Sequence, residues 1–191
     1  MKLLQERIET SAQIVDHNIV RVDMFLNHQI DVQLLDQMGE EFYRLFGPLH
    51  VTKILTAEAS GIAIACLAAL HFKVPVVYAK KGFVRTQGSN VYSTEVFSYT
   101  RNKTTQISVA QAYLKPDDRV LIIDDFLASG SAVLGLKEIV DKAGAHLVGV
   151  GIAIEKGFQD GGKKLRDMQI NLRSLAIISS IENGRVVFLE E

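Results

Sequence analysis

The chain has 191 residues, of which 48% are hydrophobic and 23% are charged, and its net charge at pH 7 is −1. This length suits one compact domain that folds without disulfides, and the single cysteine excludes a disulfide framework. The near-zero charge excludes a chain that attracts nucleic acid as a whole. The longest apolar run, Gly61–Leu70, is far shorter than the roughly 20 residues of a membrane helix. With no signal-peptide pattern at the start, we expect a cytoplasmic protein.

The first part of the chain is predicted to be mainly helical. Apolar residues at helical spacing over Leu3–Val15 predict an amphipathic helix, and Ile19–Phe25 is interpreted as a short extended segment. Asp31 is placed to cap a helix whose apolar face spans Leu34–Phe46. The dipeptide Gly47-Pro48 is expected to end this helix.

Apolar strands and helices then alternate along the chain. Val51–Thr56 and Pro75–Ala79 are strand candidates on either side of the alanine-rich helix Ile62–Leu70. Val120–Ile123 and Leu147–Ile154 are continuous apolar runs with a helical pattern between them, as expected of strands that are covered on both faces. This alternation predicts an α/β protein with a parallel sheet and crossover helices.

Three further features complete the predicted elements. Residues 80–103 are polar and rich in Gly, Ser and Thr, and we interpret them as a long flexible excursion that contains strand-like pieces such as Val91–Tyr99. Asn183-Gly184 lies between two apolar runs and predicts a two-residue hairpin. Cys66 lies in the most apolar helix and is predicted to be a core residue.

Several common site motifs are absent from the sequence. No G-x-x-x-x-G-K-[ST] occurs, and no G-x-S-x-G occurs. Gly149 and Gly151 begin a G-x-G, but Ile154 stands where the third glycine of the dinucleotide fingerprint belongs. The five histidines show no metal-ligand spacing. These absences exclude P-loop hydrolases and the usual dinucleotide and esterase motifs.

The segment VLIIDDFLASGSA, residues 120–132, carries the clearest chemistry. Asp124 and Asp125 close a buried strand, at the edge where open α/β sheets bind ligands. A loop of small residues then opens a helix, whose N–H groups suit a phosphate. The loop consists of Ala128, Ser129, Gly130, Ser131 and Ala132. Because the carboxylates would repel that phosphate, we expect them to accept hydrogen bonds from the hydroxyls of a ribose 5-phosphate. The alternative is that the aspartates only cap the helix.

This segment resembles the phosphoribosyl-pyrophosphate (PRPP) motif of the type I phosphoribosyltransferases, in which four apolar residues precede D-D-x-x-x-T-G-G-T. The chain has Ser129, Ser131 and Ala132 where that motif has Thr, Gly and Thr. The similarity to the xanthine phosphoribosyltransferase branch of the family extends along the chain. It includes three further segments, Arg21–Asp31, Glu58–Ala63 and Gly151–Gln159.

The resemblance implies the type I phosphoribosyltransferase fold. This is an α/β fold with a central, mostly parallel sheet flanked by helices, a small hood and a flexible loop. Residues 1–191 would form a single phosphoribosyltransferase domain, with hood elements from about residues 1–30 and from the C-terminal part. The flexible loop would span about residues 80–105. A homodimer is also implied.

The reaction implied by the resemblance is transfer of the ribose 5-phosphate group of PRPP to xanthine, giving xanthosine 5′-monophosphate (XMP) and pyrophosphate in purine salvage. Asp124 and Asp125 would be the catalytic residues, which bind the ribose hydroxyls and favour positive charge at the ribose. Residues 128–132 would bind the 5′-phosphate of PRPP. Mg²⁺ would act with PRPP, which would hold the ion largely by its own oxygens, so we name no protein metal ligand.

Other residues are assigned to the leaving group and the base. Ser60 and Gly61 would bind pyrophosphate together with Lys80 and Lys81, although a solvated basic spot is the alternative for the lysines. The resemblance gives three residues that contact xanthine, which are Val20, Asn27 and Lys156. Lys156 would donate to the 6-oxo group and Asn27 would serve the 2-substituent. Phe126 either stacks on the base or is a core aromatic residue.

Two alternatives stay open at this point, and a third, a catalytically silent structural homologue, is disfavoured because Asp124 and Asp125 are both present. One is a guanine/hypoxanthine or adenine phosphoribosyltransferase, which Ala132 and Lys156 disfavour. The other is a non-catalytic PRPP-sensing regulator with a DNA-binding head. About 18 residues precede the first strand candidate, too few for a winged helix, and no basic stripe compensates. We therefore expect small-molecule substrates and neither a nucleic acid nor a membrane as partner.

Overall fold

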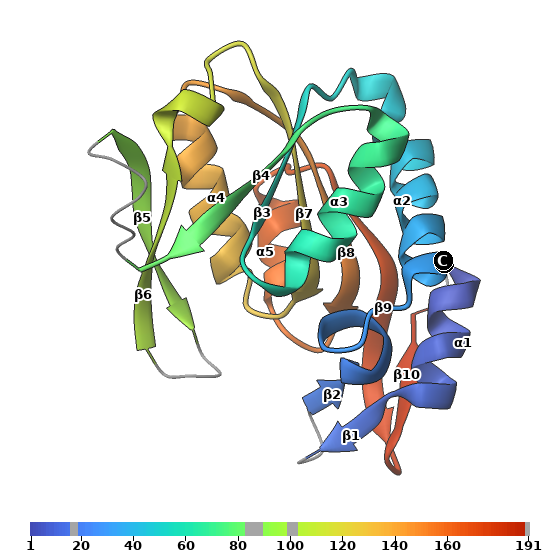
Figure 1. Cartoon of the computed structure of the whole chain (residues 1–191). Helices are drawn as coiled ribbons and strands as arrows, with labels where there is room; N and C mark the ends of the chain where they lie inside the picture. Colours follow the sequence, from blue (N-terminus) through green and yellow to red (C-terminus); the bar gives the residue numbers. More distant parts are fainter. Residues whose placement is uncertain (16–18, 83–89, 99–102, 190–191) are drawn as a thin grey trace.

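A computed structural model describes residues 1–15, 19–82, 90–98 and 103–189. Its centre is an eight-stranded sheet in the order β10-β9-β8-β7-β3-β4-β6-β5 (Figure 1). The five strands from β9 to β4 in this order are parallel, and the remaining three strands are antiparallel to their neighbours. This confirms the predicted α/β class with a mostly parallel sheet. The strands are β3 (Lys53–Ala57), β4 (Val76–Lys81), β5 (Val91–Ser98), β6 (Lys103–Ala110), β7 (Arg119–Leu127), β8 (His146–Lys156), β9 (Leu172–Glu182) and β10 (Arg185–Phe188).

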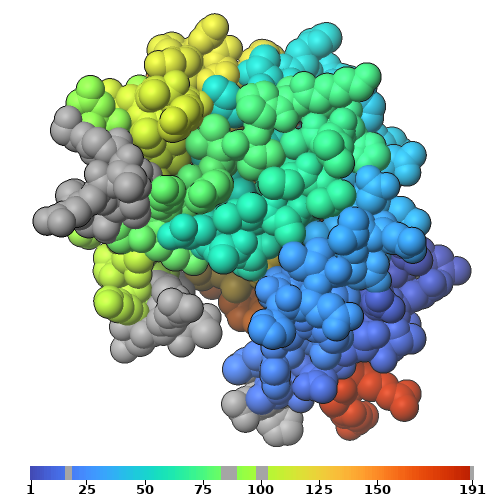
Figure 2. All heavy atoms as spheres, in the orientation of Figure 1, coloured from blue at the N-terminus to red at the C-terminus, as the bar shows by residue number. Residues whose placement is uncertain are grey.

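Helices cover both faces of this sheet, and a two-stranded sheet lies near the N-terminus (Figure 1). The small sheet pairs β1 (Gln13–Val15) with β2 (Ile19–Arg21). Figure 2 shows the N-terminal residues, in blue, next to the C-terminal hairpin, in red. No helix in the described part of the chain is long and apolar enough to cross a membrane. The α-helices are α1 (Lys2–Ser11), α2 (Val32–Phe46), α3 (Ser60–Phe72), α4 (Ser131–Lys142) and α5 (Gly161–Asp167).

The two faces of the sheet carry separate hydrophobic cores. Alternate side chains of β7 enter different cores, because successive residues of a strand point to opposite faces. Leu121 and Ile123 pack with α2 and α3, whereas Val120 and Ile122 pack with α4. All four are fully buried, which explains the continuous apolar run in this part of the sequence.

Two local predictions are confirmed in detail. The carboxylate of Asp31 accepts a hydrogen bond of 3.1 Å from the backbone N–H of Leu34 and so caps α2. Asn183 and Gly184 both have positive φ angles, 49° and 74°, and join β9 to β10. Such a pair of left-handed residues is what a type I′ hairpin turn requires.

The structure corrects the predicted extended segment Ile19–Phe25. Only Ile19–Arg21 is a strand, and Asp23–Asn27 forms a π-helical turn. Phe25 and Leu26 are both fully buried. Neighbouring residues of a strand at the edge of a core would point in opposite directions, so the chain winds here to bury both side chains.

The prediction that Cys66 is a core residue is wrong. Helix α3 buries one stripe of small and branched residues, and Cys66 faces outward, as does Leu70 with 67% of its surface exposed. The residues of α3 are apolar on nearly all sides, so the sequence gives no periodicity from which the buried side could be identified.

Residues 80–105 were interpreted as a flexible excursion with strand-like pieces such as Val91–Tyr99, and β5 (Val91–Ser98) confirms that piece. Strands β5 and β6 pair in continuous register from Val91↔Ala110 to Ser98↔Lys103 and extend the sheet. Residues 83–89 and 99–102, which belong to the predicted loop, lie outside the described residues. Strand β6 and helix α5 were not predicted.

A stability prediction follows from the contact between α2 and β8. Phe42 is fully buried, and a Cβ atom on Gly151 of β8 would lie 2.8 Å from its ring. We expect Phe42→Ala to lower the free energy of unfolding by about 3–5 kcal/mol, because a cavity is left beside a rigid strand. Urea unfolding measures this change. As a control, Gln37 in the same helix is exposed, and Gln37→Ala should change the free energy of unfolding by no more than about 0.5 kcal/mol. Equal values for both variants would contradict the packing described here.

Candidate active site

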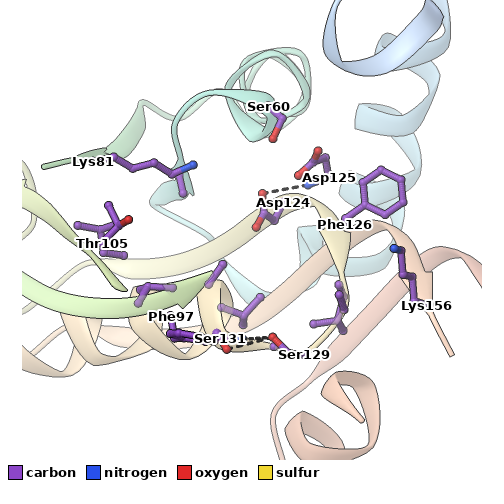
Figure 3. A pocket seen from close by; sticks show the side chains of 18 of the residues that line it. Ser60, Lys81, Phe97, Thr105, Asp124, Asp125, Phe126, Ser129, Ser131 and Lys156 are labelled. Carbon is purple, nitrogen blue, oxygen red and sulfur yellow. Dashed lines mark hydrogen bonds between the residues drawn. The ribbon is translucent and has the colours of Figure 1, made fainter. Parts of the chain in front are cut away.

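A cavity of about 420 Å³ opens at the carboxyl ends of the parallel strands. Its lining comes from the turn after β3, the end of β4, the β5–β6 hairpin, the end of β7 with the loop that follows, and the segment after β8 (Figure 3). This is the edge at which open α/β sheets bind ligands. The position predicted from residues 120–132 is therefore where the structure has its cavity.

Two adjacent carboxylates line this cavity. Asp124 and Asp125 are 6% and 9% exposed, and the backbone N–H of Asp125 donates to Oδ1 of Asp124 at 3.0 Å. Burial, together with the negative charge of Asp125, raises the pKa of Asp124 well above its usual value, while the positive charge of Lys81 acts in the opposite direction. The pair therefore favours a ligand that donates hydrogen bonds or carries positive charge. The aspartates do not end β7, which continues to Leu127.

The loop of residues 128–132 lines the cavity along its whole length. Gly130 has a φ of +81°, which few residues other than glycine adopt, and as the residue before α4 it has no side chain to cap the helix. The hydroxyls of Ser129 and Ser131 lie 3.0 Å apart at this end of the helix. The backbone N–H of Ser131 donates to the Ser129 hydroxyl at 3.4 Å. The next N–H groups of the first helical turn and these hydroxyls form a set of donors suited to an anion.

The turn between β3 and α3 lies beside the aspartates. Ser60 lines the cavity, and the Glu58–Ala59 peptide bond in this turn is cis. Gly61 does not line the cavity. A Cβ atom at this position would lie 2.1 Å from Oγ1 of Thr56 and 2.9 Å from Oδ1 of Asp124, so glycine lets the turn pack against the carboxylate.

Only one of the two lysines predicted to bind pyrophosphate, Lys80 and Lys81, lines the cavity. Lys81 lines the cavity, and its backbone N–H donates to the carboxylate of Glu58, which lines the cavity as well. Lys80 does not line it. The two lysines are successive residues of β4, and successive side chains of a strand point to opposite faces of the sheet.

Lys156 and Phe126 lie at the opposite end of the cavity from Lys81 (Figure 3). Nζ of Lys156 lies 5.9 Å from the centre of the Phe126 ring, and burial lowers the pKa of this lysine. Val20 and Asn27 do not line the cavity. Val20 of β2 is buried in the hydrophobic cluster against which Phe126 also packs, and Asn27 is exposed at the end of the π-helical turn.

Several residues that line the cavity were not predicted from the sequence. Phe97 and Thr105 come from the β5–β6 hairpin, most of which was predicted to be a long excursion. Gln159 follows β8. The hairpin is fixed to α4, because the Thr94 hydroxyl donates to Glu138 at 2.6 Å. The alternation of apolar and polar residues near Ile107 was the signal for β6.

The fold and the site define the class of protein. The model of the phosphoribosyl transferase domain matches residues 21–182. The adenine phosphoribosyltransferase of Rhodothermus marinus superposes with a TM-score of 0.74 at 21% identity over 93% of this chain and 100% of that chain. The enzyme of Saccharomyces cerevisiae superposes with a TM-score of 0.73 at 17% identity over 92% and 99%. The chain belongs to the phosphoribosyltransferase family.

Relatives with higher identity narrow this assignment. The xanthine phosphoribosyltransferase of Ruminiclostridium cellulolyticum is 55% identical to this chain over 100% of both chains. That of Latilactobacillus sakei is 52% identical over 100% of this chain and 98% of its own length. Within the family the chain groups with the xanthine phosphoribosyltransferases, which confirms the resemblance found in the sequence.

Proposed function

We propose that this protein transfers the ribose 5-phosphate group of PRPP to xanthine and releases XMP and pyrophosphate. One observation carries the proposal. Asp124, Asp125 and the loop of residues 128–132 line one cavity, and Lys156 lies at its end. The aspartates can accept hydrogen bonds from a diol, and the loop beside them can donate hydrogen bonds to a phosphate. A ribose 5-phosphate carries both groups. The names of the relatives at 47–55% identity support xanthine as the acceptor.

The proposed catalytic residues are Asp124 and Asp125. As the bond to pyrophosphate breaks, positive charge develops at the ribose, and a buried pair of carboxylates stabilises this charge more strongly than water does. The same carboxylates accept hydrogen bonds from the ribose hydroxyls and hold the sugar in place. Residues of β5 and β6 also line the cavity and would form one wall beside the reacting carbon.

Two groups of residues are proposed to bind the phosphates. Residues 128–132 hold the 5′-phosphate through backbone N–H groups and the hydroxyls of Ser129 and Ser131. Ser60 and Lys81 bind pyrophosphate from the other side of the aspartates, and Gly61 allows that turn to approach them. The role assigned to Lys80 stays a prediction, because this lysine would have to reach the ligand from the other face of β4.

The donor set fits a Mg²⁺ ion that is bound with the substrate. In the part of the chain that the structure describes, no group of three or more His, Cys, Asp or Glu residues could hold a metal ion. Mg²⁺ is commonly bound by one or two carboxylates together with substrate phosphates. Asp124 and Asp125 are the carboxylates that would share the ion, and its charge would neutralise the leaving pyrophosphate.

For the base, we propose that Lys156 donates to the 6-oxo group of xanthine and that Asn27 serves the 2-oxo group beside Val20. Lys156 lies next to Phe126, whose ring offers a flat apolar surface for a purine. Phe126 also packs against the cluster that contains Val20. A base on Phe126 would thus lie between Lys156 and the N-terminal residues.

The assignment of the base contacts predicts two different kinetic defects. Asn27→Ala should lower kcat/KM for xanthine by about tenfold more than for hypoxanthine, because only xanthine loses a partner for its 2-oxo group. Lys156→Ala should weaken both oxopurines together and leave the affinity for PRPP nearly unchanged. Steady-state kinetics with both bases measure these effects. An equal loss for both bases in Asn27→Ala would contradict the role of Asn27.

A pyrophosphate-release assay tests the proposed function directly. With PRPP and Mg²⁺ present, we expect release with xanthine to exceed release with guanine, hypoxanthine and adenine. Preference for guanine or hypoxanthine would favour the alternative transferase. Inactivity with all four bases, combined with tight binding of PRPP, would favour a PRPP-sensing regulator instead.

Three coarser properties belong to the same proposal. We propose one domain of residues 1–191 whose hood combines α1, the π-helical turn and the C-terminal hairpin, which lie at one end of the molecule (Figure 2). We also propose a homodimer in the cytoplasm. The family assignment supports these properties, and sedimentation of the purified protein would test the dimer.

A further inference from the structure

A buried ion pair lies directly behind the base end of the cavity. Glu155 precedes Lys156 in β8 and is only 2% exposed. Its carboxylate accepts two hydrogen bonds from Arg166 of α5, from Nη1 at 2.6 Å and from Nη2 at 2.8 Å. It accepts a third from the hydroxyl of Ser174 of β9 at 2.5 Å. The residue directly before Lys156 is therefore held by a carboxylate with three donors.

The same helix contacts the phosphate-binding loop. The backbone N–H of Gly161, the first residue of α5, donates to the carbonyl of Ala128 at 3.0 Å. A Cβ atom on Gly161 would lie 2.2 Å from that carbonyl oxygen and 2.7 Å from the backbone nitrogen of Gly130. Helix α5 and the loop are thus in direct backbone contact, and only glycine permits this approach.

A second glycine makes room for the ion pair. A Cβ atom on Gly162 would lie 1.9 Å from Oε1 of Glu155 and 2.6 Å from Nη1 of Arg166. One continuous set of contacts therefore runs from Lys156 and Glu155 through Arg166 and α5 to the loop of residues 128–132. It joins the end of the cavity assigned to the base to the end assigned to the phosphate.

We propose that Glu155 and Arg166 are a positioning pair that holds α5 against the phosphate-binding loop and so keeps this loop in the geometry that binds PRPP. The inference rests on the proposed function. Helix α5 has only seven residues, too few to be stable by itself. Its place on the sheet therefore depends on its tertiary contacts, which include the bidentate ion pair between Arg166 and Glu155.

Arg166→Ala tests the pair, with Arg44→Ala as the matched control. Arg44 also forms two hydrogen bonds with a carboxylate, that of Glu41, but on α2 outside the cavity. We expect Arg166→Ala to raise the Kd for PRPP with Mg²⁺ by about tenfold, because small displacements of binding groups are costly. The control should stay close to the wild-type Kd. Calorimetry measures the affinity, and the melting temperature is recorded in parallel.

Chemical rescue separates positioning from a general loss of stability. Nearly half of the Arg166 side chain is exposed, so a guanidinium ion can reach the vacated place beside Glu155. Millimolar guanidinium should restore the affinity of Arg166→Ala for PRPP, whereas methylammonium should not, because a point charge cannot donate two parallel hydrogen bonds. A lower melting temperature with an unchanged Kd would overturn the inference.

Further variants cover the case in which Arg166→Ala does not fold. Arg166→Lys keeps the charge but loses the fork, and Gly161→Ala forces the loop and α5 apart without touching the ion pair. Both should raise the Kd for PRPP, and wild-type affinity in both would overturn the inference. If the wild-type protein itself does not bind PRPP, the proposed function fails and the inference fails with it. Binding by the wild type with equal binding by all variants overturns the inference alone.

Discussion

Replacing Asp124 or Asp125 by asparagine is expected to lower kcat by about 10²- to 10³-fold, the loss typical of a missing electrostatic contact in a transition state. Asparagine keeps the shape of the side chain but cannot stabilise positive charge at the ribose. Steady-state turnover of xanthine and PRPP measures the loss. Unchanged turnover in both variants would contradict their catalytic role and leave them as buried residues of β7.

Although Asp124→Asn should lower turnover, it should raise the stability of the folded protein. The pKa of Asp124 is raised in the folded protein by burial and by Asp125, so the folded state binds this proton more tightly than the unfolded state does. The stability of the wild type therefore decreases as the pH rises from the unfolded pKa through the folded one. Asparagine removes this cost, and we expect a higher melting temperature for the variant at neutral pH. A variant that is both less active and less stable would instead indicate a misfolded site.

The second large effect is expected from Gly130→Val, which should weaken PRPP binding by more than about a hundredfold through strain and crowding in the loop. The φ of Gly130 is +81°, and a Cβ atom would also approach Cα of Gly161 to 3.4 Å. Gly184→Val is the matched control, since Gly184 has a φ of +74° in the hairpin turn with open space around it.

Calorimetry with PRPP and Mg²⁺ compares the two glycine variants. Both should lose stability, because a branched residue is strained at positive φ wherever it stands. Only Gly130→Val should lose PRPP binding. If both variants kept wild-type affinity, residues 128–132 would have to be removed from the proposed phosphate site.

The sequence was most informative where one residue pattern has a single structural solution. A four-residue apolar run followed by two aspartates and small residues predicts a covered strand at a ligand-binding edge and then a helix. Strand β7, which continues past the aspartates to Leu127, and helix α4 confirm these two elements. The cap by Asp31 and the turn at Asn183-Gly184 are likewise decided by neighbouring residues. Local chemistry of this kind does not depend on the rest of the fold.

Other features depend on contacts that no local pattern contains. Lys80 and Lys81 differ only in the face of β4 from which they project. Which of the two faces the cavity can be known only from the register of the strand in the sheet. Cys66 could not be placed, because a helix that is apolar on all sides does not show which side is buried. The contact between Glu155 and Arg166 joins β8 to α5, and α5 itself was not predicted.

The separate cores on the two faces of the sheet have a consequence for how the protein tolerates mutation. Phe42 belongs to one core and Leu136 to the other, and neither cluster contains residues of the other. Free-energy changes at sites that share no neighbours are additive, whereas changes within one packed cluster are not. Substitutions in the core beneath α2 and α3 can therefore accumulate independently of those in the core beneath α4. Over evolution, each layer of helices can be repacked while the strands between them, and the edge that carries the aspartates, stay in place.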